Sequence, residues 1–454
     1  MIEITLLVGM IIAAFGAVAI YTFIGFIPGT DETSVLLPIS LALVLTGVHP
    51  IIILTFFIAS IVTLNLTNAM PTALVGLPGG VMSSPMIEHA IDVKNRGYSA
   101  NIIQKMASAS ALGVVIAVPT SLILANLLIP LAENITQYAP YLFVTGAVFL
   151  ALTSKHRILS LFSIIPLAIV FQSLRHLYWG LGVVPLNVNV TISFFLGITI
   201  GPLLISLFQL LNHQILLTVE VKDKKNISIP SDATRNKSFN PFKILTKEER
   251  KNASLPALIV NVLFVLSPVG LTILIGESIG RRKSDKFERS TTTMITMSAI
   301  IQATYISGIV IPLFALGIPL SPVSIGPGAA LFNAPPVFTP ENNIHHLLTR
   351  FEFSLAVILG ALIAVTVSYI LISRYAKPIT LFILKRIPHE AVLGVFVAFI
   401  ILLAYMDAGF INIFGVLLVG IVSGTLNKMG VNYGVQFMSL YAAPTIINFL
   451  IGVF

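Results

Sequence analysis

Apolar runs of about 20 residues recur along most of the chain, and short polar or charged turns separate them. Runs of this length predict membrane-spanning helices, because about 20 apolar residues in a helix cross the hydrocarbon core of a bilayer. Such spans are predicted over residues 4–26, 106–130, 139–153, 158–174, 189–211, 255–279, 353–373, 390–406, 409–425 and 434–454.

Two stretches break this pattern with shorter runs that proline and glycine interrupt. In the first stretch, runs over 33–47 and 50–64 lead into the polar patch Asn65, Thr67 and Asn68. Short segments of this kind at membrane depth predict discontinuous or re-entrant helices, which are tolerated where they are buried in protein or line a wet cavity. We therefore expect an all-α polytopic membrane protein with about 10–12 membrane segments, and we expect residues 374–386 to lie along the interface.

The interrupted stretches share a motif. Residues 71–78 read PTALVGLP and residues 312–319 read PLFALGIP, each with proline at both ends and glycine two positions before the last. The two copies lie 241 positions apart, and the earlier prolines Pro28 and Pro268 lie 240 apart. The matched spacing predicts an internal duplication with broken helices, which is typical of the binding site of a secondary transporter.

We interpret the chain as two inverted-topology membrane repeats, residues 1–215 and residues 255–454. The long polar segment between them, residues 216–254, is rich in Lys and Arg and is predicted to be a cytoplasmic linker. In this arrangement the broken helices of both halves meet near the membrane midplane, and one bundle rocks against the other to give alternating access.

Composition agrees with a multi-pass protein of the cell membrane. Only 10% of residues are charged, 56% are hydrophobic and the mean hydropathy is +0.98. All 26 Lys and Arg lie outside residues 1–93 and 290–349, so the net charge of +8 reflects loop topology and contact with anionic lipid rather than nucleic-acid binding. The absence of cysteine excludes disulfides and thiolate metal sites, and the absence of GxxxxGK[ST] disfavours an ATP-driven pump.

A helix broken inside the membrane exposes backbone N–H groups at its new N-terminus, and these can bind an anion without arginine. The alternative is that the same Gly, Pro, Ser and Thr residues only serve helix packing. The candidates for substrate binding are Pro28, Gly29, Thr30, Asn65, Thr67, Asn68, Pro78, Gly79, Gly80, Ser83, Gln302, Ser307, Gly317, Pro319 and Ser321.

Asp31 and Glu32 directly follow the first break and are the candidates for ion coupling. A carboxylate inside a membrane segment costs about 2.5–3.5 kcal/mol, so it is a functional candidate that can bind Na⁺ or carry a proton. The alternative is that both acids face water or cap the following helix. Glu277 is expected to pair with Arg281 one turn later, and Asp407 is expected to be a loop residue.

The histidines give no metal site. His345 and His346 adjoin Glu341 but have no third ligand at a suitable spacing. His89 follows the first motif and is expected in a solvated loop.

The motifs taken together resemble a known family. IPGTDETSVLLP at 27–38, LVGLPGG at 74–80, a basic turn ending NRG and IPLFALGIP at 311–319 are similar, in this order, to the large permease subunit of tripartite tricarboxylate transporters, the TctA-type family. The positions that match the family are Pro28, Gly29, Pro78, Gly79, Gly317 and Pro319. The chain departs from the family at SPVG, residues 267–270, and at SAIIQATYISG, residues 298–308.

The resemblance implies a secondary active transporter for a small di- or tricarboxylate, driven by a Na⁺ or H⁺ gradient, and not an enzyme. No cofactor beyond the coupling ion is expected. The implied partners are an extracytoplasmic solute-binding protein and a small membrane subunit, together with membrane lipid, and the oligomeric state is left open with a homodimer as one alternative. The alternative function is transport of a different small polar solute, or a channel-like pore, on the same fold without accessory subunits.

Overall fold

The computed structural model describes residues 3–453 apart from 29, 31, 77–78, 155, 187–190, 211–239 and 387–388. Within these residues the structure is helical, and the β pairing consists of isolated bridges between single residues. Eight of the described helices are long and apolar enough to cross a membrane. The predicted all-α polytopic fold is therefore confirmed, and the chain is a multi-pass membrane protein. The candidates Gly29, Asp31 and Pro78 lie outside the described residues.

The first half of the chain forms α1 (Ile4–Gly25), α2 (Glu32–Leu45), α3 (Pro50–Val75), η1 (Ser84–Met86), α4 (Ile87–Asn95), α5 (Ser99–Leu128), η2 (Ile129–Leu131), α6 (Ala132–Gln137), α7 (Ala139–Thr153), α8 (Arg157–Gly180) and α9 (Thr191–Leu210). The second half forms α11 (Pro241–Ile244), α12 (Lys247–Val262), α13 (Pro268–Gly280), α14 (Lys286–Ala315), α15 (Pro322–Ile325), η4 (Ala329–Leu331), α16 (Ile344–Leu347), α17 (Arg350–Arg386), α18 (His389–Lys428) and α19 (Tyr433–Val453).

Some boundaries differ from the prediction. The polar patch that begins at Asn65 is not a break, because α3 continues through it to Val75. Burial explains the difference, since tertiary packing overrides the weak helix propensity of Asn and Thr. Residues 374–386 belong to the continuous helix α17 rather than to a separate interfacial segment. Helix α12 begins at Lys247, within the predicted linker, and most of that linker lies outside the described residues.

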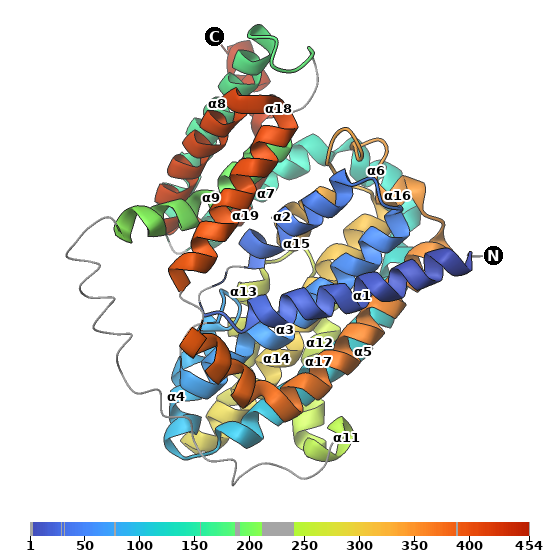
Figure 1. Ribbon diagram of the computed structural model, residues 1–454, viewed down its shortest axis with the longest axis vertical. Coiled ribbons are helices and arrows are strands. Elements are labelled where there is room, and N and C mark those ends of the chain that lie inside the picture. Colours follow the sequence, from blue (N-terminus) through green and yellow to red (C-terminus); the bar gives the residue numbers. More distant parts are fainter. Residues whose placement is uncertain are drawn as a thin grey trace.

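The helices form two bundles (Figure 1). The first bundle contains α1, α3, α5, α12, α13, α14 and α17, and the second contains α7, α8, α9, α18 and α19. Each bundle takes helices from both halves of the chain, so the bundles do not coincide with the two predicted repeats. Helix α2 lies between the bundles and packs on α3 on one side and on α9 and α18 on the other.

Packing inside the first bundle is reciprocal. Helix α3 packs on α1 and α17, and α14 packs on α12 and α5. Helix α1 also packs on α17, as α12 does on α5. A duplicated chain with α1, α3 and α5 equivalent to α12, α14 and α17 would pack in this way. The inverted orientation of the repeats stays a prediction.

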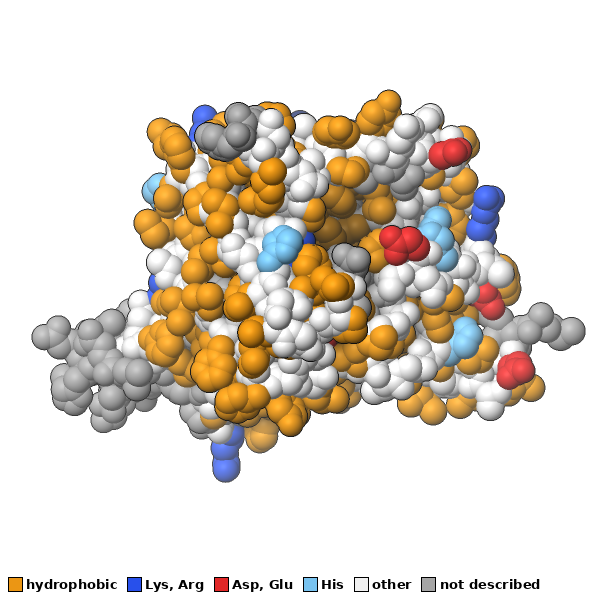
Figure 2. Space-filling model, turned by 90° about the horizontal axis from the view of Figure 1, so that it is seen from above, with side chains coloured by type: hydrophobic (Ala, Val, Ile, Leu, Met, Phe, Trp, Pro, Cys, Tyr) orange, Lys and Arg blue, Asp and Glu red, His pale blue; other side chains and the backbone are white. Residues whose placement is uncertain are grey.

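Helices α3 and α14 are the centre of this bundle. The apolar window of α14 is 100% buried and that of α3 is 89% buried, whereas that of α1 is only 28% buried. The outer helices therefore present apolar side chains outward, and Figure 2 shows such side chains over much of one face, interspersed with uncharged polar side chains and backbone and with few charged groups. Such a surface suits contact with lipid tails.

Candidate functional site

Each of the two repeated motifs ends a helix. Helix α3 ends at a glycine with positive φ, Gly76 (76°), whose N–H donates to the carbonyl of Thr72, and α14 ends before Gly317 (67°), whose N–H donates to the carbonyl of Pro312. Glycine at this position closes a helix C-terminus in the left-handed conformation, and proline commonly follows it. The motifs thus present helix carbonyls, not the N-terminal N–H groups that the sequence suggested. The partial negative charge of a C-terminus favours a cation rather than an anion.

A buried carboxylate lies next to α3 and the loop that follows it. Glu32 is in the first turn of α2 and is 2% exposed. Its Oε1 accepts hydrogen bonds from Nδ2 of Asn68 on α3 (2.9 Å) and from the backbone N–H of Met82 in the loop after α3 (3.3 Å). The hydroxyl of Thr30 donates to Oδ1 of Asn68 (3.2 Å). The first break, α3 and the following loop therefore meet at one carboxylate, and hydrogen bonds offset part of its desolvation cost.

Two glycines let the loop close over this carboxylate. A Cβ on Gly80 would lie 2.1 Å from Nδ2 of Asn68 and 2.6 Å from Oε1 of Glu32. A Cβ on Gly79 would lie 1.7 Å from the backbone oxygen of Asn68. The N–H of Gly80 donates to the hydroxyl of Ser83 (2.9 Å), which fixes the turn. Any side chain at these two positions would separate the loop from α3.

The loop after α14 folds back in the same way. The hydroxyl of Ser321 donates to the carbonyl of Gly308 on α14, and Pro319 is buried beside it. The hydroxyl of Ser307 donates to the carbonyl of Ala303 one turn earlier (2.8 Å). Thr67 on α3 makes the same contact with its own preceding turn. These hydrogen bonds are the ones that the helix-packing alternative predicts, and a role of Ser307 and Thr67 in substrate binding stays a prediction.

Two amides between α3 and α14 keep unpaired polar atoms. Both amide atoms of Asn65 are buried with no hydrogen-bond partner among the described residues. Nε2 of Gln302 donates to the carbonyl of Val62 (3.1 Å), and its Oε1 is buried without a partner among those residues. An unmade hydrogen bond of a buried polar group costs about 1–3 kcal/mol, so such atoms mark a functional candidate.

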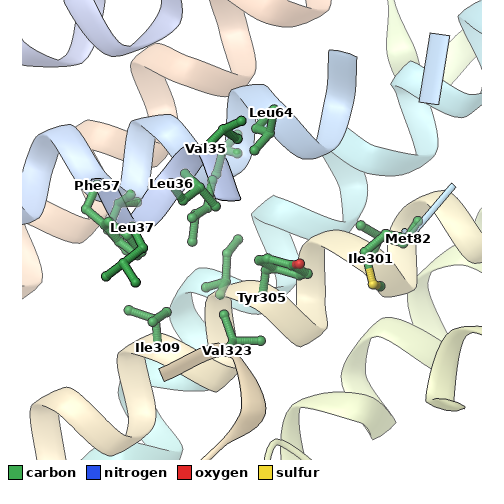
Figure 3. Packing of buried hydrophobic residues seen from close by; sticks show 14 of the residues in the cluster. Val35, Leu36, Leu37, Phe57, Leu64, Met82, Ile301, Tyr305, Ile309 and Val323 are labelled. Atoms are coloured by element: carbon green, nitrogen blue, oxygen red, sulfur yellow. The ribbon is translucent and has the colours of Figure 1, made fainter. Parts of the chain in front are cut away.

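Apolar side chains close the region between α2, α3 and α14. Figure 3 shows Val35 and Leu36 of α2, Leu64 of α3, and Tyr305 and Ile309 of α14 gathered in one cluster. All five are buried. The polar groups around Glu32 and Asn65 are therefore shielded from bulk water in this conformation.

Comparison with protein families decides the identity. A family model described as the tripartite tricarboxylate transporter TctA family matches residues 11–435. The chain belongs to the TctA family. The resemblance stated from the motifs is thus confirmed over nearly the whole chain, and the protein is a membrane component of a tripartite tricarboxylate transporter. Searches of curated proteins and of solved structures gave no match.

In this TctA-family protein an ion-pair cluster joins the two halves of the chain. Nε2 of His89 on α4 contacts Oε1 of Glu277 on α13 at 2.7 Å, and Arg289 on α14 donates to Oε2 of Glu277 at 3.4 Å. The predicted pair of Glu277 with Arg281 is present at 3.9 Å, but His89 is closer. His89 is therefore a part-buried contact between halves rather than a solvated loop residue.

A polar cavity of about 220 Å³ opens near this cluster. Its lysines are paired, with Lys105 2.6 Å from Glu249 and Lys283 2.8 Å from Glu248. The hydrogen bond that Lys283 donates to the carboxylate of Glu248 raises the pKa of Lys283 above its ordinary value. The cavity is lined by Tyr98, Lys105, Thr246, Glu248, Glu249, Asn252, Lys283, Phe287, Glu288, Thr291 and Thr292.

The paired histidines hold the loop after α14. Nδ1 of His345 hydrogen-bonds the carbonyl of Phe314 (2.9 Å), and Nδ1 of His346 accepts from the backbone N–H of Asn343 (3.4 Å). Burial and then the neighbouring His345 lower the pKa of His346 below its ordinary value. Among the described residues, no group of three or more His, Cys, Asp or Glu could hold a metal ion.

Proposed function

We propose that this chain is a secondary active transporter that moves a small di- or tricarboxylate by alternating access and couples it to a monovalent cation bound near Glu32. The TctA family supplies the transporter class. The observation that carries the coupling is the buried carboxylate of Glu32 in the first turn of α2, hydrogen-bonded by the Asn68 amide of α3 and by a backbone N–H of the loop after α3.

Charge balance supports a co-transported cation. Residues 1–93 and 290–349 hold every candidate for the site and contain no Lys or Arg. A substrate carboxylate about 5 Å from Glu32 would be repelled by about 3 kcal/mol at an effective dielectric constant of about 20. A Na⁺ ion or a proton at Glu32 removes this repulsion. Substrate then binds well only after the cation, which is the requirement for coupled transport.

The amides between α3 and α14 supply groups for the substrate. Nδ2 of Asn65 has no partner among the described residues and can donate a hydrogen bond to a carboxylate, and Nε2 of Gln302, which donates to the carbonyl of Val62, can do so once the helices separate. Val62 and Gln302 would also be equivalent positions of the two predicted repeats. They are 240 residues apart in the sequence, and so are the repeated prolines Pro28 and Pro268. Their contact suggests that an axis relating the two repeats passes between α3 and α14. A substrate at this axis would meet both repeats, as in other transporters built from inverted repeats.

The position of α2 supports movement between the bundles. Glu32 joins α2 to α3 and its loop, and Ser34, two residues later, donates to the carbonyl of Thr199 on α9 in the second bundle (3.2 Å). A displacement of one bundle against the other must therefore act on the helix that carries the coupling carboxylate. The family implies an extracytoplasmic solute-binding protein and a small membrane subunit as partners, and we propose both for this chain.

The test is uptake by proteoliposomes that contain the purified chain, with labelled di- and tricarboxylates under imposed Na⁺ or H⁺ gradients. We expect at least one carboxylate to accumulate against its own gradient and the accumulation to collapse with an ionophore for the coupling ion. Uptake that only equilibrates would favour the channel alternative. If no carboxylate is taken up, with or without a solute-binding protein, the proposed substrate class is wrong.

A further inference from the structure

The second bundle contains a helix break of its own. Within α18, Ala408 (φ −147°) and Gly409 (φ 74°, ψ −163°) leave the helical conformation. A break of this kind removes backbone donors from the carbonyls of the preceding turn. The carbonyl of Ala404 is accordingly bonded by a side chain, Nδ2 of Asn412, at 2.8 Å. Beyond the break, α18 packs closely on α9, where a Cβ on Gly201 would lie 2.5 Å from the backbone nitrogen of Gly424.

A carboxylate lies at this break. Asp407 immediately precedes the non-helical residues, and its Oδ2 accepts a hydrogen bond from the hydroxyl of Ser193 on α9. Nδ2 of Asn412 donates to the same hydroxyl (2.5 Å). Ser193 and Asn412 are both completely buried. Asp407 was expected to be a loop residue, but it lies within α18 directly before the break and contacts α9. The amide NH₂ group of Asn412 lies between the hydroxyl of Ser193 and the carbonyl of Ala404.

Two further oxygens near this carboxylate have no partner among the described residues. Oδ1 of Asn412 is buried and unpaired, and so is the hydroxyl of Tyr178 on α8. Tyr178 lies within electrostatic range of Asp407, and its hydroxyl would be 1.7 Å from a Cβ on Gly415, two turns after Asp407 on α18. Gly415 therefore allows this hydroxyl to approach the α18 backbone.

A buried arginine lies near this carboxylate without pairing with it. Arg175, one turn before Tyr178, is 4% exposed. Its Nη1 donates to Oε1 of Gln172 (3.1 Å) and its guanidinium lies over the ring of Phe194 at 5.8 Å, while its Nε has no partner among the described residues. Among the described residues no ion pair joins Arg175 to Asp407.

We propose that Asp407, Ser193 and Asn412 form a Na⁺ site in the second bundle, separate from the carboxylate of Glu32. Hard cations take oxygen ligands, and unwound carbonyls at the C-terminal end of a half-helix bind Na⁺ in other transporters. A half-turn of the Asn412 amide exchanges its NH₂ for Oδ1. The amide oxygen would then lie by the hydroxyl of Ser193 and the carbonyl of Ala404, and the hydroxyl of Ser193 lies by the carboxylate of Asp407, so four oxygens would be available to one ion. A single carboxylate balances one positive charge, which selects a monovalent cation.

This site deepens the proposed function, on which its role in coupling rests. Glu32 on α2, between the bundles, and Asp407 in the second bundle each offer one negative charge to a cation. A dicarboxylate transported with a cation at each site would cross the membrane without net charge. Because Glu32 is bonded to α3 of the first bundle, the binding of a cation at both sites would depend on the relative position of the bundles.

The test measures Na⁺ binding directly and does not need the substrate. Thermal unfolding of the purified full-length protein is followed while NaCl replaces choline chloride at constant ionic strength and fixed pH, for the wild type, Asp407→Asn, Glu32→Gln and the double variant. We expect Asp407→Asn to lower the apparent Na⁺ affinity by about tenfold or more, because it removes the charge that faces the ion. The response that remains in Glu32→Gln should vanish in the double variant.

Ser193→Ala keeps the carboxylate and removes one ligand, so it provides a second variant if Asp407→Asn fails to fold. It should weaken Na⁺ binding by a smaller factor than Asp407→Asn. An unchanged Na⁺ response in both variants would overturn the site, as would a response of Asp407 to protons but not to Na⁺. If Na⁺ binding depends on Asp407 while no carboxylate is ever transported, the site stands and the proposed function fails.

Discussion

Replacing Glu32 with glutamine should remove cation coupling while it leaves the fold intact. The two side chains have the same shape, and the glutamine Oε1 can accept the same hydrogen bonds from Asn68 (2.9 Å) and Met82 (3.3 Å). What changes is the negative charge on a side chain that is 2% exposed.

The two effects of this change differ in size. Hydrogen bonds to a charged acceptor contribute about 1.5–3 kcal/mol and those to a neutral one about 0.5–1.5 kcal/mol, so the two bonds to Glu32 lose about 2 kcal/mol together. Relief of the desolvation cost of a buried charge offsets part of this loss. A cation in contact with the carboxylate at about 2.5 Å gains about 7 kcal/mol at an effective dielectric constant of about 20. Losing even a third of this attraction lowers cation affinity about 30-fold or more.

The assay combines thermal unfolding with uptake as a function of cation concentration. Glu32→Gln should unfold within a few degrees of the wild type, yet need a much higher cation concentration for the same uptake. Glu88→Gln is the matched control, because Glu88 is an exposed acid on α4. This substitution should change neither the unfolding temperature nor the dependence of uptake on cation concentration. Wild-type cation dependence in Glu32→Gln would refute the role given to Glu32.

Other substitutions test the packing and movement around the site. Gly80→Ala should destabilise the protein by about 3 kcal/mol, because its Cβ would overlap the amide bonded to Glu32. Gly16→Ala, where nothing lies within 4 Å, should instead stabilise helix α1 by up to about 1 kcal/mol, and equal unfolding temperatures for the two variants would contradict this packing. Because the chain has no cysteine, His89→Cys with Glu277→Cys can be joined by a short bis-maleimide. The link should stop uptake if α4 and α13 must separate, and unaffected uptake would exclude that movement. The lowered pKa of His346 contributes stability above the ordinary histidine pKa of about 6.5 and loses it as the pH falls, so acidification should lower the unfolding temperature more in the wild type than in His346→Asn.

Local signals in the sequence were enough to place many helices. The apolar run over 139–153 coincides with α7, and Pro268, one of the repeated prolines, lies at a helix boundary, because Ser267 caps α13 and Pro268 begins it. Both signals act within one turn of the helix that they end or begin. The helix break predicted at the polar patch that begins at Asn65 was wrong, because long-range packing and not a local signal decides the structure there. Its residues are poor helix formers, but burial between other helices keeps α3 intact, and no local pattern reports that burial.

Some of the candidate site residues lie together in the structure, since Glu32, Asn68 and Gly80 are in contact. Their roles in binding stay predictions. The sequence could not show that the two motifs end helices rather than begin them, because the signals of proline and glycine are similar in both cases. The contact between Ser193 and Asp407 spans 214 positions of sequence, and neither residue lies in a motif, so sequence reasoning missed it.

The central claim is that carboxylate movement is driven by a cation that binds this chain. The most direct test is the steady-state accumulation ratio of a transported carboxylate in proteoliposomes, measured over a series of imposed Na⁺ gradients at fixed pH and zero membrane potential. A plot of the logarithm of this ratio against the logarithm of the Na⁺ gradient should be a straight line with a slope of about two when both Glu32 and Asp407 are present, because each carboxylate binds one cation. A slope of zero, with substrate only equilibrating across the membrane, would contradict the account.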